Sequence, residues 1–190
     1  MTSPQWLLER YVEAKDLTRP HLMQDVYAPG AVLTYSIATD TIAFPSKVEG
    51  PEGITNTLVV DFATRFDRCK TFYVCDSVPP QGVSLRVPWL VLMRERAASA
   101  LRIGKGYYLW EFTQPEPLRV TSMHIHIARM DSIADPQGSL LSAGQAVLPY
   151  PWLKPAALRS AFSALADATP TLAFLQDFLE PIDIDGVRAW

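Results

Sequence analysis

The spacing of apolar residues divides the chain into a helical first third and a sheet-forming middle. Three early segments place apolar side chains three or four positions apart, which is the period of a helix. From residue 71 onward the period falls to two, which is the period of a strand. Helices are predicted over residues 4–16, 20–27 and 51–66, and strands over 71–78, 84–95, 101–112 and 118–130. This order predicts an α+β fold in which a curved antiparallel sheet wraps round the helices.

Local signals place the ends of these elements. Ser3 is a suitable N-cap, and Pro4 fits the first turn of the first helix. The second helix is predicted to begin at the Thr18 cap and to end at Tyr27-Ala28-Pro29-Gly30. A strand should then follow over residues 31–37.

The last quarter of the chain returns to a helical pattern. A proline-rich connector, LPYPWLKP, precedes a predicted helix over residues 156–168, and Thr169 with Pro170 predicts the start of another. Phe162, Leu172 and Leu175 carry too much apolar surface to stay in water. We therefore expect a cone domain over residues 1–135 and a helical extension over 136–190 that packs on the same domain.

Several of these signals resemble the nuclear-transport-factor-two-like (NTF2-like) superfamily, which includes the SnoaL-like polyketide cyclases, scytalone dehydratase and ketosteroid isomerase. The similar features are Tyr27-Ala28-Pro29, Gly50-Pro51-Glu52-Gly53-Ile54, Gly106-Tyr107-Tyr108 and Leu118-Arg119-Val120. The resemblance covers residues 4–130. It implies a cystatin-like cone with N-terminal helices packed in a curved sheet, an internal pocket, and a dimer formed by pairing sheets back to back.

Scytalone dehydratase offers a closer comparison, because its first helix and first strand are similar to ERYVEAKD and VLTYS. That similarity places its catalytic aspartate near Glu13 and its strand tyrosine at Tyr35. Its two catalytic histidines would fall at Thr71 and within the apolar run Trp89 to Leu92. The same dehydration is therefore disfavoured, and Tyr35 is the residue that the resemblance carries over.

Two of the three histidines, His124 and His126, lie two apart in a predicted strand and so share one face. The resemblance implies that Leu118 and Val120 point into the cone, so we expect both imidazoles to line its interior. Imidazole can give and take protons near neutral pH. The alternatives are structural hydrogen bonds or a place on the other face at a dimer interface. A metal would need a further ligand such as Glu111, which nothing in the spacing selects, so no metal site is predicted.

Aromatic residues are dense on the predicted sheet, and an aromatic cavity with a few polar groups suits a flat or hydrophobic small molecule. The pattern leaves open which side of the strand over residues 104–112 faces that cavity. The residues expected to contact a ligand are Glu13, Phe62, Trp89, Tyr108 and Trp110.

Composition excludes several classes of function. Seventeen Lys and Arg against 20 Asp and Glu give a net charge of −3, which disfavours binding to nucleic acid. No apolar run of about 18 residues predicts a membrane span, so we expect a cytoplasmic protein with no membrane partner. Cys69 and Cys75 lie six apart in a predicted strand, roughly 20 Å, too far for a disulfide. No phosphate loop or nucleophile elbow is present, and no cofactor is predicted.

These observations predict a SnoaL-like protein that binds a hydrophobic small molecule in its cone. The expected activity is cofactor-free acid–base catalysis of the isomerase, dehydratase or cyclase type, with His124 or His126 as acid or base and Tyr35 orienting the substrate. The alternative is a non-catalytic binding or dimerisation module. A homodimer is expected because Trp89-Leu90-Val91-Leu92-Met93 is apolar on both faces of the sheet, although the helical tail could cover the second face instead.

Overall fold

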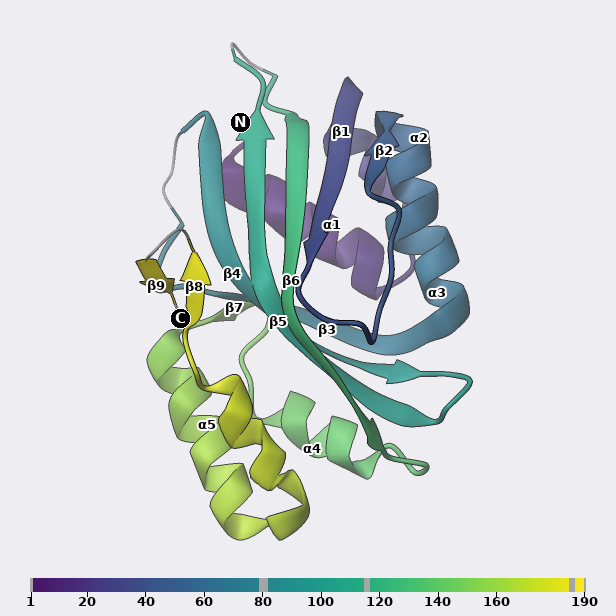
Figure 1. Cartoon of the computed structure of the whole chain (residues 1–190). Coiled ribbons are helices and arrows are strands. Elements are labelled where there is room, and N and C mark those ends of the chain that lie inside the picture. Colours follow the sequence, from purple (N-terminus) through teal and green to yellow (C-terminus); the bar gives the residue numbers. More distant parts are fainter. Residues whose placement is uncertain (1, 79–81, 115–116, 185–186, 190) are drawn as a thin grey trace.

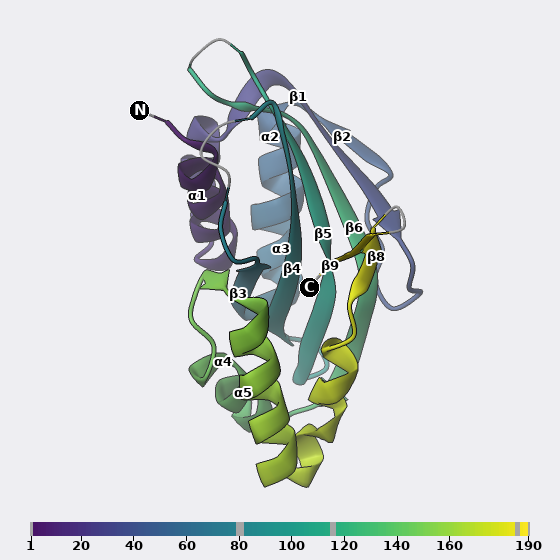
Figure 2. The same ribbon diagram turned by 90° about the vertical axis from the view of Figure 1, so that its left-hand side faces the viewer.

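The computed structural model describes residues 2–78, 82–114, 117–184 and 187–189. A strongly curved sheet holds the N-terminal helices on one side, and the C-terminal helices lie toward its lower end (Figure 1; Figure 2). The described helices are α1 (Pro4–Asp16), η1 (Pro20–Asp25), α2 (Gly50–Thr55), η2 (Asn56–Val60), α3 (Asp61–Arg65), α4 (Ser139–Ala146), α5 (Pro155–Ala168) and η3 (Pro170–Phe178).

Seven of the described strands form one sheet in the order β2-β1-β6-β5-β4-β3-β7. The pairs β1 with β6 and β3 with β7 are parallel, and the other neighbours are antiparallel. Two short C-terminal strands, β8 and β9, pair with each other. The strands are β1 (Tyr27–Ile37), β2 (Lys47–Glu49), β3 (Phe66–Val74), β4 (Ser84–Glu95), β5 (Ala100–Phe112), β6 (Val120–Ala134), β7 (Trp152–Leu153), β8 (Ile182–Ile184) and β9 (Val187–Ala189). The predicted α+β cone is confirmed, but the sheet is mixed and not wholly antiparallel, because β1 and β7 join it parallel to β6 and β3.

The predicted start of α1 is correct, whereas the second helix differs at both ends. The Ser3 hydroxyl accepts a hydrogen bond from the Trp6 N–H at 3.1 Å, as an N-cap should. Thr18 was predicted to cap the second helix, but Arg19 is the residue before it. The φ of 53° at Thr18 turns the chain ahead of this helix. Tyr27 already belongs to β1, because its backbone pairs with Val120 of β6.

The third helix contains a wider turn in its middle. Residues 56–60 are a π segment, in which the Asp61 N–H donates to the carbonyl of Asn56, five residues earlier. Ile54 and Leu58 are buried on its inner side. Phe66 was predicted to end this helix, but it begins β3 because it pairs with Glu95 of β4.

The two faces of the sheet belong to two hydrophobic cores. Trp89, Val91 and Met93 of β4 point into the cone and pack with α1 and the third helix. Leu90 and Leu92 point to the other face and pack under the C-terminal helices. Cover for this second core comes from Leu141, Leu158, Phe162, Leu172, Leu175 and Phe178, all buried.

Four described elements of the C-terminal extension, namely α4, β7, β8 and β9, were not predicted from the sequence. Helix α4 lies against β4, where the side-chain amide of Gln145 donates to the Leu92 carbonyl at 3.0 Å. Strand β7 pairs Trp152 with Tyr73 of β3 and so extends the sheet at its edge. Within the described residues, no helix is long and apolar enough to cross a membrane. Cys69 and Cys75 are both free thiols.

The packing of the extension predicts the effect of truncating its central aromatic ring. Phe162→Ala should reduce the free energy of unfolding by about 3–5 kcal/mol, because the ring is fully buried between α5 and the sheet. Trp6→Ala is the control, since Trp6 is 39% exposed and its loss should cost less than about 1 kcal/mol. Denaturant unfolding measures both, and equal losses would contradict the packing described here.

Candidate functional site

A cavity of about 50 Å³ lies inside the cone, between the N-terminal helices and the concave face of the sheet. Its walls come from α1, β1, the connection between β1 and β2, the third helix and strands β3 to β6. The wall is overwhelmingly apolar. Its residues are Tyr11, Lys15, Tyr35, Ile42, Phe44, Leu58, Phe62, Thr71, Trp89, Val91, Met93, Tyr108, Ile125, Ile127 and Met130.

Aromatic rings of α1, β4 and β5 build one side of the cavity. Trp89 stacks on Tyr108 with ring centroids 5.6 Å apart, and Tyr11 meets the edge of Tyr108 at 5.9 Å. The Trp89 indole crosses Gly106 so closely that a Cβ there would lie 2.7 Å from the ring and 1.9 Å from the His126 carbonyl. A glycine at this position therefore allows Trp89 to lie flat against β5.

Two buried hydrogen-bond donors in this wall have no partner among the described residues: the Tyr35 hydroxyl and the Trp89 indole N–H. Buried polar groups are normally paired, since leaving one unpaired costs free energy. The Tyr35 ring is held by Phe44, which stacks on it at 4.8 Å with the planes 4° apart. Both donors belong to side chains that line the cavity.

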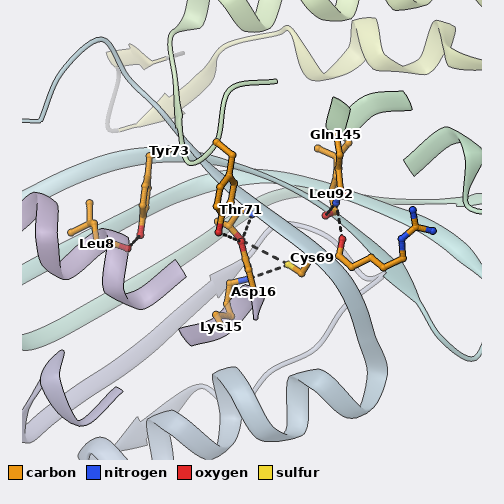
Figure 3. A network of polar contacts seen from close by, with 10 residues as sticks. Leu8, Lys15, Asp16, Cys69, Thr71, Tyr73, Leu92 and Gln145 are labelled. Carbon is orange, nitrogen blue, oxygen red and sulfur yellow. Dashed lines mark hydrogen bonds and ion pairs between the residues drawn. The ribbon is translucent and has the colours of Figure 1, made fainter. Parts of the chain in front are cut away.

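A buried ion pair, Lys15 with Asp16, lies at the end of α1, where Lys15 lines the cavity (Figure 3). Lys15 donates to the Asp16 carboxylate at 2.8 Å and also contacts the Cys69 sulfur at 3.3 Å. Asp16 further accepts from the Thr71 N–H at 2.6 Å, the Thr71 hydroxyl at 3.0 Å and the Tyr150 hydroxyl at 3.1 Å. Its carboxylate is therefore fully engaged in holding α1, β3 and the C-terminal extension together.

The titratable groups of the wall keep their protons at neutral pH. Burial raises the pKa of the Tyr11, Tyr35 and Tyr108 hydroxyls. Burial lowers the pKa of Lys15, but the charge and hydrogen bond of Asp16, together with Cys69 and Tyr11, raise it by more in total, so the net direction is upward. Burial also raises the pKa of the neighbouring Cys69 thiol to about 12. The wall consequently contains a permanent cation and neutral hydroxyl donors.

Four residues predicted to contact the ligand or substrate line the cavity: Tyr35, Phe62, Trp89 and Tyr108. Trp110 is fully buried in the same inward row of β5, where its ring packs against Tyr11 at 5.2 Å, and it is not part of the cavity wall. The side of β5 that faces the interior of the cone is therefore the one that carries Tyr108, Trp110 and Phe112.

The prediction for Glu13 is wrong, because its side chain points away from the cavity. It forms ion pairs with Arg10 at 3.4 Å and Arg19 at 2.7 Å on the outer side of α1. The helical period places Tyr11 and Lys15, four residues apart, on the inner side instead. The carboxylate at the inner end of α1 belongs to Asp16, whereas the resemblance to scytalone dehydratase pointed to Glu13.

The predicted orientation of His124 and His126 is also wrong, and a β-bulge is the reason. Phe112 of β5 pairs with Val120, whereas Glu111 pairs with Ser122, so Thr121 is an extra residue in β6. Val120 does face the inner core, but the bulge reverses the alternation after it. Met123, Ile125 and Ile127 therefore face inward, and both histidines lie on the opposite face of the sheet.

On that outer face the histidines join a half-buried polar cluster with β1. The Ser36 hydroxyl contacts His124 at 2.8 Å and His126 at 2.7 Å, and the Thr34 hydroxyl contacts the other ring nitrogen of His124 at 2.8 Å. Tyr107 stacks on His126 at 4.8 Å. Burial lowers the pKa of both imidazoles, and the neighbouring His124 lowers that of His126 further.

Sequence reasoning missed three features of the cavity. Ile42 and Phe44 lie in a connection without a regular pattern, and the Lys15–Asp16 pair looked like an ordinary charged helix end.

Among the described residues, no group of three or more His, Cys, Asp or Glu side chains is placed to hold a metal ion. Glu111 is displaced from the histidines, since Leu109 is the residue of β5 that pairs with His124.

No protein-family model matches the sequence, and neither does any curated protein. Solved structures do resemble it. A hexachlorocyclohexane dehydrochlorinase, LinA-type3, from Novosphingobium barchaimii matches with a TM-score of 0.53 and 14% identity over 68% of this chain and 87% of that chain. A proposed scytalone dehydratase from Novosphingobium aromaticivorans matches with a TM-score of 0.51 and 14% identity over 70% of this chain and 90% of that chain. An NTF2-like superfamily protein from Salmonella enterica serovar Typhimurium matches with a TM-score of 0.50 and 13% identity over 70% of this chain and 90% of that chain.

At these identities the likeness establishes the fold and carries no activity with it. The chain has an NTF2-like fold, as the sequence resemblance implied. In the matches described above, the part of this chain that is covered amounts to about two thirds of its length.

The ion pair beside the cavity generates a stability prediction. Asp16→Ala should lower the free energy of unfolding by about 3–5 kcal/mol, because it leaves the buried Lys15 ammonium without its carboxylate. Adding Lys15→Met to this variant should recover part of the loss by removing the unpaired charge. Asp167→Ala, at an exposed position, is the control, and a loss as small as the control's in chemical denaturation would refute this role for Asp16.

Proposed function

We propose that this chain, which has the NTF2-like fold, uses its cone cavity to bind a small hydrophobic molecule that carries a hydrogen-bond acceptor. The observation that carries the proposal is the pair of buried donors, the Tyr35 hydroxyl and the Trp89 indole N–H, without partners in an apolar wall. A carbonyl or ether oxygen would satisfy such a donor, and the aromatic rings would cover the rest of the molecule.

The wall favours binding over acid–base catalysis. None of the residues described in it carries a carboxylate or an imidazole, and Lys15 and the tyrosines hold their protons at neutral pH. An elimination, such as the dehydrochlorination named for one structural neighbour, requires a group that accepts a proton. The non-catalytic binding module is therefore the better-supported of the two functions that the sequence suggested.

The size of the cavity limits what it can accept as it stands. An apolar cavity of about 150 Å³ can hold benzene. A cavity of about 50 Å³ accordingly takes a molecule of only a few heavy atoms unless side chains move. Affinity for such a molecule is low, since each heavy atom contributes at most about 1.5 kcal/mol.

A titration with butanone tests this proposal. Butanone has a short apolar chain and one carbonyl, and we expect it to bind with a Kd of about 1 mM, which corresponds to about 4 kcal/mol. Binding should shift the NMR resonance of the Trp89 indole N–H, which is identified by its loss in Trp89→Phe. Tyr35→Phe should weaken binding about fivefold, the value of one hydrogen bond near 1 kcal/mol.

Tyr107→Phe is the matched control, because Tyr107 lies on the outer face beside His126 and does not line the cavity. This variant should bind butanone like the unchanged protein. A Trp89 resonance that stays unmoved up to solubility-limited butanone would refute the proposal, and so would an equal loss of affinity in the two tyrosine variants.

The homodimer stays a prediction, but its contact is now expected on a different part of the sheet. Leu90 and Leu92, on which the expectation of an uncovered apolar face partly rested, lie under the chain's own C-terminal helices. The part of the outer face beyond them carries Tyr107, Leu109 and His126, which are half-buried in the single chain. We place the dimer contact on this part of the face.

Sedimentation at micromolar concentration decides the assembly. A dimer should sediment at twice the 21.2 kDa of one chain, and Leu109→Arg should dissociate it by placing a charge in the contact. Val147→Arg serves as the control at an exposed position of the extension. A stable monomer at 21.2 kDa would show that the extension alone completes the sheet.

A further inference from the structure

A second pocket, of about 150 Å³, adjoins the cavity in the cone. It lies between the connection from β1 to β2 and the third helix. Its wall is more polar than that of the inner cavity. The lining residues are Ala43, Phe44, Pro45, Thr57, Asp61, Phe62, Arg65 and Phe66.

Phe44 and Phe62 belong to the walls of both spaces, so the two rings form the partition between them. Phe44 stacks on Tyr35 at 4.8 Å, and the Lys15 ammonium lies over the Phe62 ring at 4.7 Å. Each ring is half-buried. A partition made of two side chains can open by rotation about their side-chain bonds, with the backbone in place.

The backbone on both sides of the partition is built around this arrangement. Thr41 anchors the connection before Phe44, because its hydroxyl donates to the Met130 carbonyl at 2.6 Å and its carbonyl accepts from Arg102 at 2.6 Å. Across the pocket, the π segment Asn56–Val60 widens the helix directly before Asp61. Such wide turns recur at functional sites because they redirect the side chains that follow.

We infer that the two spaces are chambers of one binding site and that the natural ligand spans both. This inference rests on the proposed function. The ligand is an elongated molecule whose oxygen acceptor and first few carbon atoms occupy the inner chamber. Its remaining body passes between Phe44 and Phe62 into the outer chamber, where Thr57, Asp61 and Arg65 can bind a polar end. The inner volume of about 50 Å³ is too small for such a molecule alone, whereas the outer chamber adds about 150 Å³.

Benzylacetone is the probe for this inference, because it is butanone extended by one phenyl ring. In the unchanged protein it should shift the Trp89 indole resonance as butanone does. Its phenyl protons should show nuclear Overhauser contacts to the methyl groups of Ala43 and Thr57 in the outer chamber. Contacts of the phenyl ring elsewhere, with the ketone in the inner chamber, would overturn the inference.

Thr57→Phe tests the outer chamber by filling it. This variant should bind benzylacetone about tenfold more weakly, because the extended molecule can use only conformations in which its second half is displaced. It should bind butanone with unchanged affinity, since butanone needs the inner chamber alone. Asn56→Phe is the matched control: it makes the same type of substitution on the same π segment, at an exposed position that lines neither space.

The outcomes separate this inference from the proposed function. If butanone binds and Thr57→Phe leaves benzylacetone binding unchanged, the two-chamber site is wrong and the inner site stands. If butanone fails to bind the unchanged protein, both fall. Ala43→Leu fills the same chamber from the opposite wall and replaces Thr57→Phe if that variant does not fold, with the same expected selective loss.

Discussion

The buried carboxylate of Asp16 is the interaction on which the arrangement of this protein depends. Its hydrogen bonds come from Lys15 in the same helix, from Thr71 in β3 and from Tyr150 in the C-terminal extension. A carboxylate that is 1% exposed is tolerated only with such partners, because the cost of removing its charge from water is large. One side chain thus links α1, β3 and the C-terminal extension.

The sheet has two apolar faces, and the chain covers them by two different means. Inside the cone, the N-terminal helices pack on Trp89, Val91 and Met93. On the other face the chain uses its own C-terminal helices over Leu90 and Leu92. What the extension leaves uncovered is the histidine cluster of β6, where Ser36 bridges His124 and His126. The chemistry that looked most reactive in the sequence therefore lies apart from the cavity.

The cavity combines a permanent cation, neutral hydroxyl groups and aromatic rings, and this set of groups is the basis of the proposal that it binds a small molecule. Proton transfer needs a group whose pKa lies near the working pH. Burial moves the tyrosines away from that range, and Asp16 keeps Lys15 charged. Structural neighbours named for enzymatic activities share the fold at 14% sequence identity, and a shared fold carries no activity with it.

Local patterns in the sequence were sufficient for the described helices except α4, for the long strands and for the N-cap at Ser3, because period and capping act over a few residues. The orientation of His124 required the tertiary structure. A bulge at Thr121 reverses which side chains face the cavity from Ser122 to Ile127, and its place depends on the register with β5. The same holds for Asp16 and Phe44, whose partners Thr71 and Tyr35 lie on other elements and are brought near only by folding.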